Sequence, residues 1–311
     1  MPSVCFCFEV HQPYRLRPYS FFDMGAKNDY EDARHNREVM RKVAEKCYLP
    51  MNALLLELIE RHQGRFRVSF SLTGIVIDQF MEYAPEVLDS FRALARTGCV
   101  EFLDETDNHS LACLFSEDEF CSEVRRHRER MRELFGQSPR VFRNTELVYN
   151  NDVARMARDM GYDVILAEGA ESVLGWRSPH FVYQPASCPG MKLMLRSYSL
   201  SDDIAFRFSN REWPAYPLMA DTFAGWLHSV KGNGDVINLF MDYETFGEHQ
   251  WADTGIFRSG RPLPRPRRTR HSQLRFVGRC RTRSFRMARQ RHAERRLPRP
   301  VRMSRTREVR Q

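Results

Sequence analysis

The sequence predicts an α/β fold built on parallel strands, of a size that suits a single barrel. Between residues 2 and 257, short apolar runs alternate with longer stretches of helical apolar spacing, which is typical of repeated βα units. A chain of 311 residues with 42% hydrophobic content can bury one sizeable core, and no second domain is required. Polar clusters also follow the ends of the apolar runs, as expected at the open end of a parallel barrel.

Seven apolar runs of four to seven residues are the candidate strands. They are residues 4–10, 67–72, 99–103, 140–143, 163–167, 192–196 and 236–241. Their length and their content of Val, Ile, Leu and Phe favour strands over helices.

The stretches between these runs carry helix signals. An apolar stripe over residues 39–59 is interrupted at Pro50. Pro85 is placed to begin another helix, because proline is tolerated in the first helical turn. Ser116 and Glu119 have the spacing of a capping box, and Gly136 is placed to end the helix that follows them.

Composition excludes several classes of protein. The eight cysteines are scattered and never form a CxxC pair, so we expect reduced thiols, no metal site and no cofactor. No basic leader precedes the first apolar run, and no run of eighteen apolar residues exists. We therefore expect a soluble, cytoplasmic protein with no membrane partner.

The net charge of +8 comes from two unlike parts of the chain. Residues 258–311 hold 20 arginines, no lysine and two acids, a net charge of +18, which leaves −10 for residues 1–257. The arginine-rich segment lacks an apolar period, so we expect it to be disordered. Its abrupt composition favours an out-of-frame origin over a nucleic-acid-binding arm, and we expect no nucleic-acid partner.

Acidic and imidazole side chains follow five of the candidate strands. They are His11 after the first, Glu105 and His109 after the third, Glu146 after the fourth, Glu168 after the fifth, and Asp242 and Glu244 after the seventh. The loops at the carboxyl ends of barrel strands build active sites, so these residues are expected to meet at one opening.

Two carboxylates stand out as candidates for glycosidic bond cleavage, which requires one acid to protonate the leaving oxygen and a second carboxylate. Glu146 comes just past a strand end, beside Arg143 and Tyr149. Asp242 ends a buried strand, where partial desolvation and other acids would raise its pKa towards that of a general acid.

At these residues the chain resembles glycoside hydrolase family 57. Four segments are similar to the first four of its five conserved regions: His11-Gln12-Pro13, residues 98–102 (GCVEF), 145–149 (TELVY) and 241–251 (MDYETFGEHQW). Residues 168–179 and 200–208 also resemble the α-amylase branch of that family. The resemblance covers residues 1 to about 257.

The resemblance implies a (β/α)7 barrel, an incomplete TIM-like barrel, over residues 1–257. It implies a retaining enzyme acting on α-1,4-glucans such as starch, glycogen and malto-oligosaccharides. By the same resemblance, Glu146 is the nucleophile and Asp242 the general acid/base. The implied substrate-binding residues are His11, His109, Glu244 and Trp251, of which Trp251 could instead pack at the barrel edge.

Two departures from the family pattern keep other functions open. Residues 104–111 lack the aromatic side chains expected near positions 107 and 108, and the arginine-rich segment stands where the fifth region should follow. A 4-α-glucanotransferase or branching enzyme would use the same two carboxylates. An inactive, truncated fragment that binds carbohydrate weakly is an alternative of another class. A metal-dependent deacetylase is disfavoured, because no His-x3-His pair lies beside an aspartate.

Overall fold

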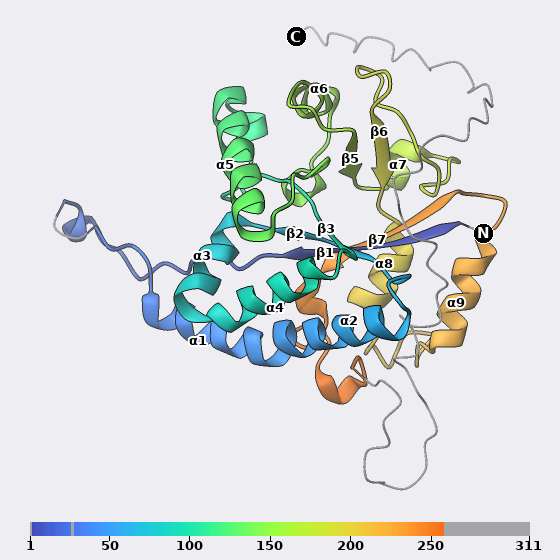
Figure 1. The fold of residues 1–311 in the computed structure, drawn as a ribbon, viewed down its shortest axis with the longest axis horizontal. Coiled ribbons are helices and arrows are strands. Elements are labelled where there is room, and N and C mark those ends of the chain that lie inside the picture. Colours follow the sequence, from blue (N-terminus) through green and yellow to red (C-terminus); the bar gives the residue numbers. More distant parts are fainter. Residues whose placement is uncertain (1, 26–27, 258–311) are drawn as a thin grey trace, which may run out of the picture.

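A computed structural model of the chain describes residues 2–25 and 28–257 (Figure 1). The expected disorder and out-of-frame origin of residues 258–311 concern residues outside this description. No helix among the described residues is long and apolar enough to cross a membrane.

All seven predicted strands are present, each within one residue of its predicted ends. They are β1 (Ser3–Val10), β2 (Val68–Leu72), β3 (Val100–Phe102), β4 (Val141–Arg143), β5 (Val164–Ala167), β6 (Lys192–Leu195) and β7 (Val236–Asp242). Every pair of neighbouring strands is parallel, as the βα alternation predicts.

The strands form two parallel sheets, so the closed (β/α)7 barrel expected from the resemblance is not confirmed. One sheet has the order β3-β2-β1-β7 and the other the order β4-β5-β6. At the seams between the sheets only isolated parallel bridges occur, between Asp104 and Phe142 and between Arg196 and Asn238. The strands β3 and β4, which border one seam, have only three residues each.

Helices surround the sheets. They are α1 (Ala33–Val43), α2 (Leu49–Arg61), α3 (Gly74–Tyr83), α4 (Pro85–Arg96), α5 (Glu117–Phe135), α6 (Asn151–Asp159), α7 (Glu171–Leu174), α8 (Tyr198–Ala205) and α9 (Ala220–Ser229). Figure 1 shows α1, α2 and α4 together on one side of β1 and β2, with α5 and α6 on the other.

The helix ends predicted at Pro85, Ser116 and Gly136 are confirmed. Ser116 Oγ accepts a hydrogen bond from the Glu119 amide (3.2 Å) at the start of α5, and Gly136 ends this helix in the left-handed conformation. Pro85 is the first residue of α4. The helix is not interrupted at Pro50, which lies in the first turn of α2; a π-helical turn, Ala44–Tyr48, joins α1 to α2 just before it.

The segment that follows β7 packs against this π-helical turn. Gly247 has a φ of 120°, and a Cβ atom there would lie 2.0 Å from the Lys46 carbonyl oxygen. The hydroxyl of Tyr48, in the same turn, donates a hydrogen bond to Glu244. The backbone after β7 therefore packs directly on the junction of α1 and α2, where only glycine fits at position 247.

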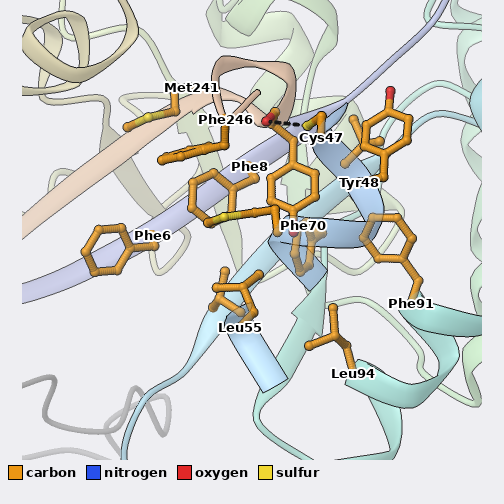
Figure 2. Packing of buried hydrophobic residues seen from close by; sticks show 14 of the residues in the cluster. Phe6, Phe8, Cys47, Tyr48, Leu55, Phe70, Phe91, Leu94, Met241 and Phe246 are labelled. Atoms are coloured by element: carbon orange, nitrogen blue, oxygen red, sulfur yellow. Dashed lines mark hydrogen bonds between the residues drawn. The ribbon is translucent and has the colours of Figure 1, made fainter. Parts of the chain in front are cut away.

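The largest apolar core lies between these helices and the sheet of β1, β2, β3 and β7. Its centre is aromatic: the ring of Phe70 lies 5.2 Å from that of Phe91 and 5.8 Å from that of Phe8 (Figure 2). The Cys47 thiol donates to the Tyr243 carbonyl oxygen (3.1 Å), so this cysteine is a core thiol as expected. Such packing fixes the strand ends that carry the polar residues.

Candidate active site

A cavity of about 150 Å³ opens at the carboxyl ends of the strands and contains both candidate carboxylates. Its walls come from β1, β4, β5, β6, β7 and α8 and the residues just after them. They include Glu9, Arg143, Glu146, Glu168, Arg196, Phe206, Phe240, Asp242 and His249. Of the seven residues expected to meet at one opening, Glu146, Glu168 and Asp242 line this cavity, whereas His11, Glu105, His109 and Glu244 do not.

Glu146 stands at the cavity on a strained turn. It lies in the short helix Thr145–Leu147 after β4, with a φ of 53°, and Leu147 has a φ of 54°. The Glu146 side chain is 72% exposed. Non-glycine residues rarely adopt this backbone conformation, and such strain concentrates at functional sites, where it aims a side chain.

Asp242 is the last residue of β7 and is exposed towards the cavity, where its strand neighbour is also acidic. In the parallel register of β1 and β7, Asp242 pairs with Glu9. Glu9 is buried and also lines the cavity. The two strands therefore bring two carboxylates to the same wall.

A buried arginine balances these acids. Arg143, at the end of β4, is fully buried; its guanidinium lies 2.5 Å from Glu9 Oε2 and 3.1 Å from Glu105 Oε2. Burial raises the pKa of Glu9 overall, although the charge of Arg143 opposes this. Burial acts in the same direction on Glu105, but Arg143 and the hydrogen bond from His109 outweigh it and lower its pKa to about 2.

His109 connects this buried network to Glu146. Its Nδ1 atom lies 3.4 Å from Glu105 Oε2, and its Nε2 atom lies 3.3 Å from Glu146 Oε1 and 3.6 Å from Glu9 Oε1. Burial alone would lower the pKa of His109, but the hydrogen bond and charge of Glu105 raise it overall. The imidazole is therefore held towards its cationic form beneath the nucleophile candidate.

His11 stacks on His109 and contacts Thr73. The two imidazole rings are 4.0 Å apart at an angle of 21°, and His11 Nδ1 lies 3.0 Å from Thr73 Oγ1. Burial and the neighbouring His109 lower the pKa of His11 to about 4. His11 is therefore neutral at neutral pH and can accept or donate one hydrogen bond.

None of the four expected substrate-binding residues, His11, His109, Glu244 and Trp251, is part of the cavity wall, although His109 contacts Glu146 on it. Glu244 is buried behind it, bonded by the Tyr48 hydroxyl, and burial raises its pKa to about 8. Trp251 is 64% exposed and does not line the cavity. This exposure disfavours the alternative that Trp251 packs at the edge of the strands.

The region that lacks the expected aromatic residues is occupied by an ion pair between the buried Asp107 and the half-buried Arg130. Asp107 Oδ1 lies 3.2 Å from Nε of Arg130 on α5. The backbone amide of Asn108 donates to Glu123 Oε2 (2.8 Å). Positions 107 and 108 thus attach the loop after β3 to α5.

Sequence reasoning missed several residues of the cavity. Glu9 lies within an apolar strand, and only its register beside Asp242 could have indicated it. Arg196 and Phe206 follow β6 and α8 and carried no chemical signal of their own. Among residues 2–25 and 28–257, no group of three or more His, Cys, Asp or Glu side chains could hold a metal ion.

Paired carboxylates on one cavity, at the carboxyl ends of parallel strands, are typical of glycoside hydrolases. The chain belongs to glycosyl hydrolase family 57, whose family model matches residues 5–277.

Three known proteins show how far the similarity extends. A curated protein of Methanocaldococcus jannaschii named "Putative alpha-amylase" is 51% identical over 263 residues, 84% of this chain and 55% of that protein. The chain thus spans about half the length of this relative.

Two solved structures share the fold. A 4-α-glucanotransferase from Thermococcus litoralis superposes with a TM-score of 0.63 at 17% identity, covering 83% of this chain and 36% of that chain. A branching enzyme from Pyrococcus horikoshii gives 0.62 at 14% identity, covering 82% and 66%.

Proposed function

We propose that this protein cleaves α-1,4-glucosidic bonds with retention of anomeric configuration. The observation that carries the proposal is that Glu146 and Asp242 line one cavity, with an imidazole of raised pKa touching the first. Membership of family 57 and the name of the M. jannaschii relative support an α-amylase-like activity. We also propose that the seven strands form the family's (β/α)7 barrel. Their spatial order follows the chain order: β3 lies beside β4 at one seam, β6 lies beside β7 at the other, and β7 pairs with β1.

In the first step, the Glu146 carboxylate attacks the anomeric carbon while Asp242 gives its proton to the departing glycosidic oxygen. The carbon–oxygen bond to the leaving sugar breaks, and a glycosyl ester of Glu146 forms. In the second step, Asp242, now ionised, takes a proton from water, whose oxygen attacks the same carbon and releases the carboxylate. A retaining pair requires the two carboxyl groups to stand about 5 to 5.5 Å apart.

The imidazole of His109 would have a role in both steps. When it is protonated, it offsets the charge of Glu146 in the ground state and stabilises the carboxylate as a leaving group in the second step. His11, which is neutral, would hydrogen-bond a sugar hydroxyl beside it. Glu244, being buried, would act on the sugar through the backbone that it holds in place.

Transfer to a sugar acceptor is the second candidate. Two proteins that share the fold, a 4-α-glucanotransferase and a branching enzyme, favour it. The same residues would catalyse it, with an acceptor hydroxyl in the place of water in the second step.

Incubation of the full chain with maltopentaose tests both candidates. Hydrolysis with retention gives shorter maltodextrins whose new reducing ends appear first as the α-anomer in ¹H NMR. Transfer gives products longer than maltopentaose. Initial formation of the β-anomer contradicts the mechanism, and an absence of any turnover favours the truncated, inactive fragment.

A further inference from the structure

One large apolar side chain is exposed inside this polar cavity. Phe206 lines the cavity, and this residue is 68% exposed. Half of the other residues on the wall are charged, and two of them, Arg196 and Glu168, form an ion pair (3.2 Å). An apolar ring left in water within a concave site is typical of a surface that a ligand covers.

The backbone that carries Phe206 is held from two sides. The carbonyl oxygen of Ala205, the residue before it, accepts a hydrogen bond from Gln250 Nε2 (2.8 Å) in the segment after β7. Asp202, one turn earlier in α8, pairs with Arg196 at the end of β6 (2.6 Å). The backbone that carries the ring is therefore fixed, so only the two side-chain torsions of Phe206 remain to be ordered when a ligand packs on it.

Phe206 stands on the Asp242 side of the cavity. The helix α8 that ends beside it packs on β7, the strand that Asp242 ends, and the Phe240 amide donates to Ser201 Oγ (3.2 Å) in that helix. The proposed general acid gives its proton to the oxygen of the leaving sugar. The leaving sugar must therefore lie next to Asp242, within reach of the wall that Phe206 forms.

We infer that Phe206 is a stacking platform for the glucosyl unit on the leaving-group side of the scissile bond. The apolar face of a pyranose ring packs on an aromatic ring, and the side chain of Phe206 has only two torsions and a fixed backbone. After the first half-reaction, the same platform holds an incoming acceptor sugar. Phe206 thereby affects the ratio of transfer to hydrolysis. This inference rests on the proposed function, because it takes an α-glucan as the ligand of the cavity.

Binding can be measured apart from turnover in a Glu146→Gln background. Calorimetric titration with maltopentaose gives the parent affinity, which Phe206→Ala is expected to lower roughly tenfold, while Phe206→Tyr stays near the parent. Phe115→Ala is the matched control, because Phe115 is 86% exposed but does not line the cavity, and it should leave affinity unchanged. Thermal melting of each variant checks that it is folded.

The outcomes separate this inference from the proposed function. If the parent does not bind maltopentaose, both fail. If the parent binds and Phe206→Ala binds equally well, the proposed function stands and the platform is refuted. Weakening by Phe206→Tyr or Phe115→Ala equal to that of Phe206→Ala also overturns it, since the effect is then not specific to an aromatic face in the cavity.

Turnover gives a second, independent test in the active chain. α-Maltosyl fluoride has a leaving group without a ring, so Phe206→Ala should leave its kcat/KM close to the parent value. With maltopentaose the same variant should lose roughly tenfold in kcat/KM and form fewer transfer products. An equal loss on both substrates would place the effect on the reacting sugar and overturn the assignment to the leaving-group side.

Discussion

The Nε2 atom of His109 lies 3.3 Å from Oε1 of Glu146, although the two residues come from loops after different strands. His109 and Glu146 both have a φ in the left-handed region, 54° and 53°. The charged and titratable groups that face the His109 ring are Glu9, Glu105, Glu146, His11 and Arg143. Two strained loops thus bring an imidazole and an exposed carboxylate together, and the buried Glu105 beside the ring raises the pKa of His109.

Replacement of the nucleophile is the first prediction. Glu146→Gln keeps the shape of the side chain but loses its charge, so turnover of maltopentaose should fall by about a thousandfold or more, with binding changed little. Steady-state kinetics and calorimetry measure the two effects. Glu129→Gln, at an exposed acid on α5, is the control. Retention of a tenth or more of the activity in Glu146→Gln would show that another group attacks the sugar.

The second prediction tests whether Asp242 protonates the leaving oxygen. Asp242→Asn cannot protonate a leaving oxygen, so kcat/KM on maltopentaose should fall by about a hundredfold or more. Fluoride leaves without a proton, so formation of the glycosyl ester from α-maltosyl fluoride should be slowed much less. Equal losses in burst-phase measurements on the two substrates would assign Asp242 a structural role.

The buried Glu9 gives the third prediction. If Glu9 raises the pKa of His109, its replacement changes that pKa, which a purely structural role would not do. In Glu9→Gln the ring of His109 loses one of the anions that raise its pKa, so this pKa should fall. NMR titration of the ring protons, assigned by the signal missing from His109→Gln, measures the change. A neutral His109 no longer pairs with Glu146, so the basic limb of the rate profile should move to lower pH. An unchanged His109 titration in Glu9→Gln would exclude this role.

The next prediction tests whether the buried Glu244 contacts the substrate. Its pKa is raised to about 8, above the ordinary value of 4.5, so it is protonated at neutral pH. The unfolded chain releases this proton more readily, so wild-type stability falls as pH rises from about 4.5 to 8. Glu244→Gln mimics the protonated acid and should weaken that pH dependence in urea unfolding. It should also leave maltopentaose affinity nearly unchanged, whereas a large loss of affinity would indicate direct contact with the sugar.

The strands and the two carboxylates could be predicted from the sequence, because both depend on local pattern. An apolar run of about five residues defines each strand, and an acid directly after such a run stands at the carboxyl end of the sheet. Glu146 and Asp242 meet these conditions, and both line the cavity.

The remaining features depend on packing that no local pattern describes. Phe206 reaches the cavity only because α8 packs on β7, where Ser201 accepts a hydrogen bond from the amide of Phe240, 39 residues later in the sequence. Glu244 looks like a cavity residue two positions after Asp242, but the turn that follows β7 directs it back to Tyr48. The seams between the sheets arise where short strands pair through single bridges, which hydrophobic periodicity cannot detect.

A second histidine, outside the cavity, should make the stability of the fold depend on pH. His127 on α5 is fully buried, with Nδ1 2.5 Å from Asp104 Oδ1 and Nε2 2.6 Å from the Leu72 carbonyl oxygen. Burial alone would lower its pKa, but the hydrogen bond and charge of Asp104 raise it to about 9. The folded state therefore holds this proton more tightly than the unfolded chain, whose histidine titrates near 6.5.

The contribution of His127 is fully present below about pH 6.5 and is lost as pH rises through 9. A shift of this size corresponds to a loss on the order of 3 kcal/mol of unfolding free energy. Urea unfolding at pH 6, 7.5 and 9.5 should show this decrease in the wild type. In His127→Gln, which does not titrate, the decrease should be smaller by about that amount, while other groups contribute equally to both proteins. Parallel pH dependences would mean that His127 is neutral in the folded protein and that its contact with Asp104 is a neutral hydrogen bond.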